Sequence, residues 1–217
     1  MDVLKAPLGK ASETLGKRIC ESLLSCGYKS AVYVGTASEA LEAASGMIPD
    51  GVSVGVPGTV TVRQIGLMEK LEARGCRVIH HWDPSLTPEA KSERIAEENA
   101  ADWFVTSSNA VTYDGKMINI DGTGNRVAAM AWGTGKILYV IGMNKAVRDV
   151  ESAITRVRDV ATCPNSIRIG MDTPCVMQGH CTDCTSPQRV CRAVLILERA
   201  PFGRDAHVIL VGEALGY

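Results

Sequence analysis

The sequence predicts an α/β fold, with a mostly parallel sheet covered by helices on both faces. Short, nearly continuous apolar runs rich in β-branched residues alternate along the chain with segments whose apolar residues recur at helical spacing. Glycine, proline and polar turns separate the two kinds of segment. Continuously apolar strands that alternate with helices are typical of a parallel sheet buried on both sides. A chain of 217 residues has an ordinary length for one such core, and we expect a single domain over 1–217.

The first half of the chain repeats a strand and a helix several times. Leu15, Ile19 and Leu23 recur at helical spacing before Gly27, which predicts an amphipathic first helix. Apolar runs predict strands at 31–34, 52–54, 77–79 and 103–105. Helical patterns follow the first three of these strands, at 38–44, 62–74 and 89–100. This alternation indicates parallel strands joined by crossover helices.

The second half continues the pattern and adds one irregular segment. A turn at 113–116 and a strand at 117–120 are followed by a small-residue helix at 125–132 and a strand at 137–141. The remaining predicted elements are a helix at 146–160 and strands at 194–197 and 208–211. Proline, glycine and cysteine interrupt any regular structure before the last two strands. We therefore expect a cysteine-rich insertion at about 161–192 within the single domain.

Composition and charge exclude several classes of protein. A formal net charge of −1, 46% apolar residues and a pI near 6.4 argue against a disordered chain and against a general nucleic-acid binder. The longest strongly apolar stretch, 137–143, is far too short to span a membrane. The first five residues lack the apolar core of a signal peptide. We therefore expect a soluble, cytoplasmic protein with no nucleic-acid partner and no membrane span, of unspecified oligomeric state.

The glycine-rich loop after the second strand is a candidate anion site, because ligands of such folds gather where parallel strands end. Gly55 and Gly58 would let a ligand approach the backbone, and Thr59 and Arg63 would add a hydroxyl and a cation. The residues at 61–64 have the capping-box pattern, which would leave helix N–H groups near the ligand. A tight, well-capped turn without a ligand explains the same residues, since their spacing matches neither a Walker loop nor a dinucleotide fingerprint.

A second polar cluster follows the predicted strands at 103–105 and 117–120. Small hydroxyls, amides, a carboxylate and a guanidinium gather there around glycines, as a pocket for a small oxygen-rich ligand requires. Capping of a turn and of the next helix is the alternative. The amine of Lys145, after the strand at 137–141, is expected at the same sheet edge as these polar side chains. The candidate ligand-binding residues of this cluster are Asn109, Asp121, Gly122, Gly124, Asn125, Arg126 and Lys145.

Other reactive residue types receive structural roles. His80 and His81 are adjacent at a strand end and point to opposite faces, which favours satisfied or exposed histidines over a shared metal. Cys20, Cys26 and Cys76 are interpreted as small core residues. The sequence contains no Ser-His-Asp order and no nucleophile elbow, so no catalytic residue is assigned.

A group of four thiols in the polar segment near the last two strands is a candidate metal site. They are Cys175, Cys181, Cys184 and Cys191. A Cys-x2-Cys pair presents two sulfurs to one metal, and a loop with glycine and prolines can supply two more. Zinc sites usually pair two such units and this segment has one, so we favour a [4Fe–4S] cluster and keep zinc as the alternative. Cys163 or His180 would be the substitutes in this ligand set.

Several motifs together resemble the LUD domain family. They are Gly55-Val-Pro-Gly58-Thr59, Ser107-Ser-Asn109, Asn119-Ile-Asp121-Gly-Thr-Gly124-Asn-Arg126 and Val140-Ile-Gly-Met-Asn144-Lys145. The four-cysteine pattern is similar to that of the cysteine-bearing branch of the family. The resemblance spans nearly the whole chain and implies a fold like that of sugar-phosphate isomerases, CoA transferases and formyltetrahydrofolate cyclo-ligases. It also implies a role in bacterial lactate utilisation, beside iron–sulfur partner proteins.

Two functions follow from these features. In the first, the chain is an accessory component of the oxidation of lactate or a related hydroxy acid to pyruvate. Arg126 and Lys145 offset the carboxylate of a small ligand, and the cysteines hold an iron–sulfur cluster or another metal. In the second, the chain is a stand-alone isomerase-like or transferase-like enzyme, or a sensor, acting on a phosphorylated or CoA-linked molecule, with a structural metal. Asp121 would be the general base of that enzyme. The sequence leaves open whether the chain is itself an enzyme.

Overall fold

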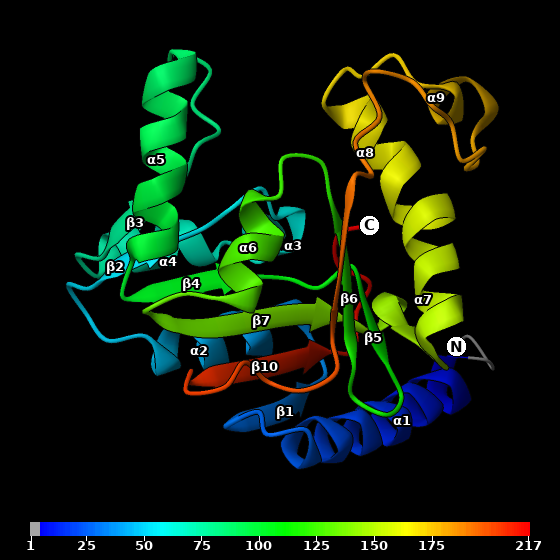
Figure 1. The fold of residues 1–217 in the computed structure, drawn as a ribbon. Coiled ribbons are helices and arrows are strands. Elements are labelled where there is room, and N and C mark those ends of the chain that lie inside the picture. The colour runs from blue at the N-terminus through cyan, green and yellow to red at the C-terminus, as the bar shows by residue number, and fades with distance from the viewer. Residues whose placement is uncertain (1–4) are drawn as a thin grey trace.

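The computed structural model describes residues 5–217 and consists of two β-sheets with helices packed around them (Figure 1). The residues at 1–4, within the stretch where the sequence lacks a signal-peptide core, lie outside the described part of the chain. No helix between residues 5 and 217 has both the length and the apolar character that a membrane crossing needs.

The bounds of the elements follow the predicted alternation closely. The strands are β1 Ser30–Val34, β2 Ser53–Gly55, β3 Arg77–Ile79, β4 Trp103–Thr106, β5 Ala110–Thr112, β6 Met117–Asp121, β7 Lys136–Gly142, β8 Ala146–Val147, β9 Ala193–Leu197 and β10 Ala206–Val211. The α-helices are α1 Lys5–Ser25, α2 Ala37–Met47, α3 Val60–Gln64, α4 Leu67–Ala73, α5 Pro88–Ala100, α6 Asn125–Ala131, α7 Val150–Arg156, α8 Cys163–Arg168 and α9 Pro174–Gln178. A 3-10 turn, η1 Met143–Lys145, and a π-helical segment, η2 Val157–Thr162, complete the set.

The larger sheet confirms the predicted α/β fold. Its six strands lie in the order β1-β10-β7-β4-β2-β3, and every neighbouring pair is parallel. Because the strands are parallel, their carboxyl ends share one edge, and the loops that follow β2, β3, β4 and β7 meet there. The expected polar loops are therefore brought to one side of the molecule.

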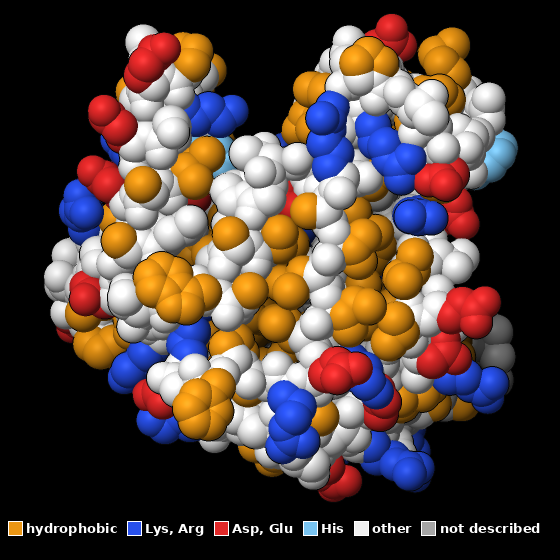
Figure 2. Space-filling view, in the orientation of Figure 1, with side chains coloured by type: hydrophobic (Ala, Val, Ile, Leu, Met, Phe, Trp, Pro, Cys, Tyr) orange, Lys and Arg blue, Asp and Glu red, His pale blue; other side chains and the backbone are white. Residues whose placement is uncertain are grey.

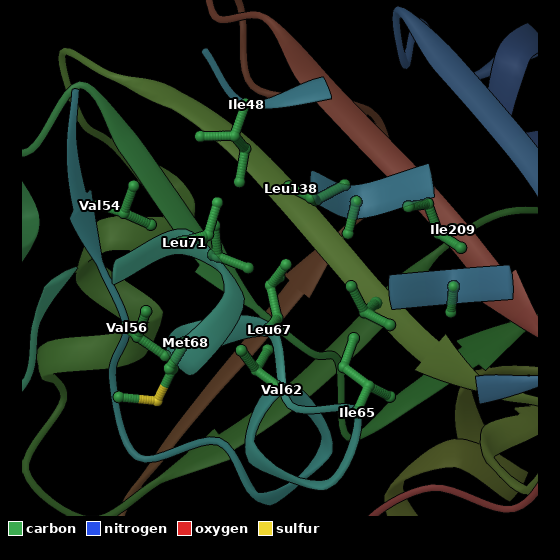
Figure 3. Packing of buried hydrophobic residues seen from close by; sticks show 14 of the residues in the cluster. Ile48, Val54, Val56, Val62, Ile65, Leu67, Met68, Leu71, Leu138 and Ile209 are labelled. Carbon is green, nitrogen blue, oxygen red and sulfur yellow. The ribbon is translucent and has the colours of Figure 1, made fainter. Parts of the chain in front are cut away.

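Helices cover both faces of the larger sheet, as predicted. On one face, α2, α3 and α4 pack against the sheet around Ile48, Val62, Leu71 and Leu138, all fully buried (Figure 3). On the other face, α1 and α6 pack around a second cluster that includes the buried Tyr139. The strand residues alternate between these two clusters, which explains why the strands read as continuous apolar runs.

A smaller sheet stands against the carboxyl edge of the larger one and was not anticipated from the sequence. Its strands lie in the order β8-β5-β6-β9, with antiparallel β5–β6 and β6–β9 pairs. The helix α7 packs against it around a separate apolar cluster. The strand predicted at 194–197 therefore belongs to this second sheet, while the one at 208–211 becomes β10 in the middle of the first.

Two predicted helices differ from the expected ones. The helix expected at 62–74 is divided into α3 and α4 at Gly66, whose φ of 71° lies in the left-handed region. The capping box expected at 61–64 is wrong, because α3 already begins at Val60 and its N-cap makes no side-chain hydrogen bond. The helix expected at 146–160 starts only after Asp149, whose carboxylate accepts the N–H of Ser152, and it becomes π-helical at η2.

Candidate functional site

A cavity of about 710 Å³ lies at the carboxyl edge of the larger sheet. Its floor comes from the residues after β2, β4 and β7, and the small sheet contributes the end of β6. One wall comes from α5 and the segment before it, and the opposite wall comes from α8 and the cysteine-rich segment. Figure 2 shows the opening as a deep notch between the projections that these walls form.

Most of the residues that the sequence singled out for ligand binding do line this one cavity. They are Gly58, Thr59, Asn109, Asp121, Gly122, Asn125, Arg126 and Lys145. The two polar clusters that the sequence suggested separately, after β2 and after β4 and β6, are thus parts of a single site. Which of these residues touch a ligand stays a prediction.

Gly55, Arg63 and Gly124 lie outside the cavity, and each has a structural reason for its identity. A Cβ on Gly55 would stand 2.1 Å from the carbonyl oxygen of Glu98, so glycine lets α5 approach β2 closely. The guanidinium of Arg63 stacks 4.8 Å above the centre of the Trp82 ring. Gly124 has a φ of 89° at the N-cap of α6, a left-handed conformation that favours glycine.

Arg126 lines the cavity, is half-buried, and is held by a hydrogen-bond network within the protein. Its Nη2 donates to Asn109 Oδ1 and to the carbonyl of Ile120, both at 2.9 Å, and its Nη1 donates to Asn119 Oδ1 at 3.2 Å. Its Nε lies 3.6 Å from Asp121 Oδ2. Most of the N–H groups of Arg126 are therefore used within the protein, and its positive charge shapes the floor of the cavity from below.

Lys145 is a buried amine with an unusual environment. Its side chain is only 3% exposed, and its Nζ lies 2.8 Å from Thr61 Oγ1 and 3.0 Å from Ser107 Oγ. Burial, followed by the positive charges of Arg156 and Arg126, lowers the pKa of Lys145 to about 7. A role of Lys145 in offsetting the carboxylate of a ligand, as the sequence suggested, stays a prediction.

Arg156 explains part of the lowering of the pKa of Lys145. It is buried, and its guanidinium donates to the carbonyls of Asn109 at 2.6 Å and Asn144 at 3.0 Å. Its charge therefore sits among neutral acceptors close to the amine. The hydroxyl of Thr59 adds another unusual feature, since it is buried at the cavity wall and has no hydrogen-bond partner among the described residues. Such an unpaired donor is costly to bury unless a ligand or water meets it.

A histidine held by a buried carboxyl group lines the wall that α5 and the segment before it form. His81 Nδ1 lies 2.7 Å from Oε1 of Glu98, a residue with no exposed surface. Burial raises the pKa of Glu98, while its hydrogen bond to His81 acts in the opposite direction. The other Glu98 oxygen, Oε2, has no hydrogen-bond partner within residues 5–217. This contact fixes the imidazole by its Nδ1, which leaves Nε2 as the nitrogen available for proton transfer.

The outer part of the cavity is strongly basic. Four further basic side chains line it: Lys91, Arg168, Arg189 and Arg192. With Arg126 and Lys145 they make six basic side chains among the described residues that line the cavity, against one acidic side chain, that of Asp121. Lysine and arginine side chains gather on the α8–α9 side of the notch in Figure 2. Excess positive charge in a concave site favours an anionic ligand.

The cysteine-rich segment builds the wall through its arginines rather than its thiols. Arg189 donates to the carbonyls of Cys184 at 2.6 Å and Cys191 at 2.9 Å, and its Nη2 pairs with Asp183 at 2.8 Å. The thiol of Cys163 donates to the carbonyl of Cys175 at 2.9 Å. Among residues 5–217, no three cysteine, histidine or acidic side chains form a group that could hold a metal ion. In the described arrangement the four thiols of the predicted metal site are not gathered into one ligand set, and metal binding by them stays a prediction.

Several site residues were not found from the sequence, for different reasons. Thr61 was interpreted as a helix cap, although its hydroxyl contacts Lys145. His81 was given a structural role, although its position at the end of β3 places it at the same sheet edge as the other loops. Arg189 and Arg192 lie in the cysteine-rich segment, which was interpreted from its cysteines alone. His81 could have been found from the sequence, because ligands of such folds bind where parallel strands end. The place of Arg189 and Arg192 at the cavity could be seen only in the structure.

Comparisons with known proteins give a consistent result. A family model described as LUD domain matches residues 17–211. A DUF162 family protein from Deinococcus radiodurans is similar in structure, with a TM-score of 0.54 and 17% identity over 93% of this chain and 98% of that chain. At this level of identity the likeness shows a shared fold.

Two further solved structures are more weakly similar. Translation initiation factor eIF-2B from Pyrococcus horikoshii OT3 has a TM-score of 0.37 and 13% identity, over 54% of this chain and 49% of that chain. Ribose 5 phosphate isomerase A from Neisseria gonorrhoeae has a TM-score of 0.35 and 17% identity, over 63% of this chain and 66% of that chain. No curated protein matches the sequence.

Proposed function

The chain belongs to the LUD domain family, and from this premise we propose that it is an accessory component of the oxidation of lactate or a related hydroxy acid to pyruvate. In this role it binds the small carboxylate in the cavity at the carboxyl edge of the larger sheet. The observation that carries the proposal is the charge of that cavity, to which the described residues contribute six basic side chains and one acidic side chain.

The inner end of the cavity supports a small carboxylate ligand. The unpaired hydroxyl of Thr59 can donate to a carboxylate oxygen, and the buried charges of Arg126 and Arg156 lie beneath the floor. His81, held by Glu98, supplies a group that can take the proton of the ligand's hydroxyl. Electron transfer from the hydroxy acid would involve iron–sulfur partner proteins, which is a further part of the proposal.

A thermal-shift measurement on the full chain tests ligand binding. Lactate or pyruvate at about 100 times its dissociation constant should stabilise the folded state by about 2.7 kcal/mol, a rise of several degrees in Tm. Replacing Thr59→Val keeps the shape of the side chain and removes the hydroxyl, so the rise should become smaller. Thr14→Val, in the exposed first helix, is the matched control. Stabilisation by sugar phosphates or CoA esters, with none by lactate or pyruvate, would defeat the proposal.

The size of the cavity favours a second candidate function. Its volume of about 710 Å³ falls in the range that holds drug-sized ligands, and its outer arginines lie away from the inner end. A phosphorylated or CoA-linked molecule would use both parts, as expected of an isomerase-like or transferase-like enzyme or a sensor. Arg168→Gln should then weaken binding of such a ligand and leave lactate binding unchanged. Arg199→Gln, outside the cavity, is the control.

Metal binding by the four cysteines is proposed separately from the ligand site. A [4Fe–4S] cluster at Cys175, Cys181, Cys184 and Cys191 is preferred on sequence grounds, and zinc is the alternative. The thiols would have to move together to hold either, so no step of the proposed function passes through a metal. Protein purified without oxygen should show iron–sulfur absorption and contain sulfide if the cluster forms. Zinc without sulfide would support the alternative. Protein that contains neither iron nor zinc would exclude both metal sites.

A further inference from the structure

The two hydroxyls that contact Lys145 fix the orientation of its amine. Thr61 Oγ1 donates onward to the carbonyl of Leu215 at 3.4 Å, and Ser107 Oγ donates onward to the carbonyl of Ser108 at 3.3 Å. Each hydroxyl has one hydrogen, so each can only accept from the amine. The Nζ of Lys145 therefore donates two N–H groups, to acceptors at 2.8 Å and 3.0 Å.

The remaining position on this nitrogen is free for chemistry. A lysine nitrogen has three positions besides its carbon, and the two hydroxyls take two of them. Lys145 lines the cavity, and no further hydrogen bond to its Nζ is formed by the described residues. With the pKa of Lys145 lowered to about 7, a large share of the amine carries a lone pair at this position near neutral pH. An oriented, uncharged amine beside a cavity is the arrangement of a lysine nucleophile.

We propose that Lys145 forms a Schiff base with the carbonyl carbon of a 2-keto acid bound in the cavity, an inference that rests on the carboxylate-binding function proposed above. The Nζ lone pair attacks the carbonyl carbon, a C–N bond forms, and the carbonyl oxygen becomes a hydroxyl. That oxygen then leaves as water with the two hydrogens of the amine, and a C=N bond remains. The imine takes one proton from solvent, and no electrons are gained or lost.

The neighbours of Lys145 suit the uncharged amine that attacks the carbonyl carbon. Before attack, the buried guanidinium groups of Arg126 and Arg156 disfavour a charged amine. The covalent step narrows the ligands to 2-keto acids such as pyruvate, because these have the keto carbonyl that the amine attacks. A hydroxy acid such as lactate binds without a covalent bond.

Borohydride trapping tests the inference. The full chain is incubated with pyruvate and sodium cyanoborohydride, its intact mass is measured, and peptide mapping locates any reduced adduct. We expect one adduct per chain, on Lys145. Lactate, which has a hydroxyl in place of the keto group, should leave the mass unchanged. Lys145→Met should reduce adduct formation to background, while Lys10→Met, on the exposed face of α1, should not change it.

The Tm in lactate and in pyruvate, measured on the same preparation, separates the two proposals. Stabilisation by either ligand without an adduct overturns the Schiff base and leaves carboxylate binding standing. An adduct on Lys145 without stabilisation by lactate supports the Schiff base and removes lactate as a ligand. An adduct on other lysines overturns the inference, and the absence of both signals overturns both proposals. Mapping on the unaltered chain decides the question even if Lys145→Met does not fold.

Discussion

Lys145 and Arg126 are both basic, but they are fitted for different tasks at the inner end of the cavity. Arg126 keeps its charge and donates to three acceptors of its own protein, so it contributes a fixed positive field. Lys145 contacts two neutral hydroxyls and can lose its proton. From the sequence, both residues are simply basic. Their hydrogen-bond partners in the folded chain decide that Arg126 supplies a fixed positive charge and that Lys145 supplies a reactive amine.

The pH dependence of stability provides a test of the state of Lys145. Its pKa falls from an ordinary value of 10.5 to about 7 on folding. Below pH 7 the amine is charged in both states, and the cost of burying that charge is fully present. As the pH rises from about 7 toward 10.5, the unfolded chain holds a proton that the folded chain has lost, so stability rises.

The unaltered chain should therefore gain stability over Lys145→Met by up to about 1.4 kcal/mol per pH unit in this interval. Urea unfolding at a series of pH values measures the difference, in which the contributions of other groups cancel. Lys10→Met, at an exposed site, should show no comparable slope. Equal slopes for the two variants would mean that Lys145 keeps its proton when folded.

The contact between α5 and β2 depends on Gly55. Alanine at this position would bring a Cβ within 2.1 Å of the backbone of α5, so the helix would have to shift. We expect Gly55→Ala to destabilise the fold by about 1–3 kcal/mol, the usual cost of overpacking. Chemical denaturation measures the loss. Gly46→Ala in α2 has open space around its Cβ and should be neutral or stabilising, by up to about 1 kcal/mol.

Arg189 holds the cysteine-rich segment in place by three hydrogen bonds to that segment. Removing it in Arg189→Ala should loosen the loop between α9 and β9 without unfolding the sheet. Hydrogen exchange should become faster in peptides that cover 181–191 and stay unchanged in β10. Arg199→Ala, whose side chain bonds the carbonyl of Ser25 instead, should leave this segment unchanged. Unaltered exchange at 181–191 would show that other contacts hold the loop.

The elements differ in how far local sequence decides them. The strands of the larger sheet and the longer helices were predictable because their apolar residues are buried against the neighbouring layer along the whole element. The short elements β5, β8, α8 and α9 were not predicted. The division at Gly66 was missed because a single glycine is tolerated inside many helices, and only its positive φ reveals the break. The small sheet was missed because β9 and β8 pair with β6 and β5 over long distances in the sequence, Leu197 with Met117 and Ala146 with Val111. The metal prediction rests on thiol spacing, which does not fix where the four sulfurs lie.

Charge is distributed unevenly over the whole molecule. The formal net charge is −1, yet six basic side chains and one carboxylate line the cavity. The acidic residues that compensate this excess lie elsewhere on the chain. Such a distribution attracts anions toward one place without making the protein a general polyanion binder.

Binding of a phosphorylated ligand should accordingly depend on ionic strength. The outer arginines are near solvent, where the Debye length falls from about 10 Å at 0.1 M salt to about 3 Å at 1 M. Calorimetry should show the affinity falling on the order of tenfold over this interval. A neutral sugar of similar size is the control, since its affinity should be little affected. An affinity that does not change with salt would mean that the outer arginines do not contact the ligand.

The place of β10 has a consequence for how the protein forms. In the larger sheet β1 is an edge strand whose neighbour is β10, and β10 also separates β1 from β7. On the ribosome, β1 therefore waits for nearly all of the remaining sequence before it gains a strand partner. The sheet closes late, through a parallel pairing of high contact order, which is a slow step. Until then the apolar face of α1 and β1 stays without its final cover, so we expect the nascent chain to be most prone to aggregation in this interval.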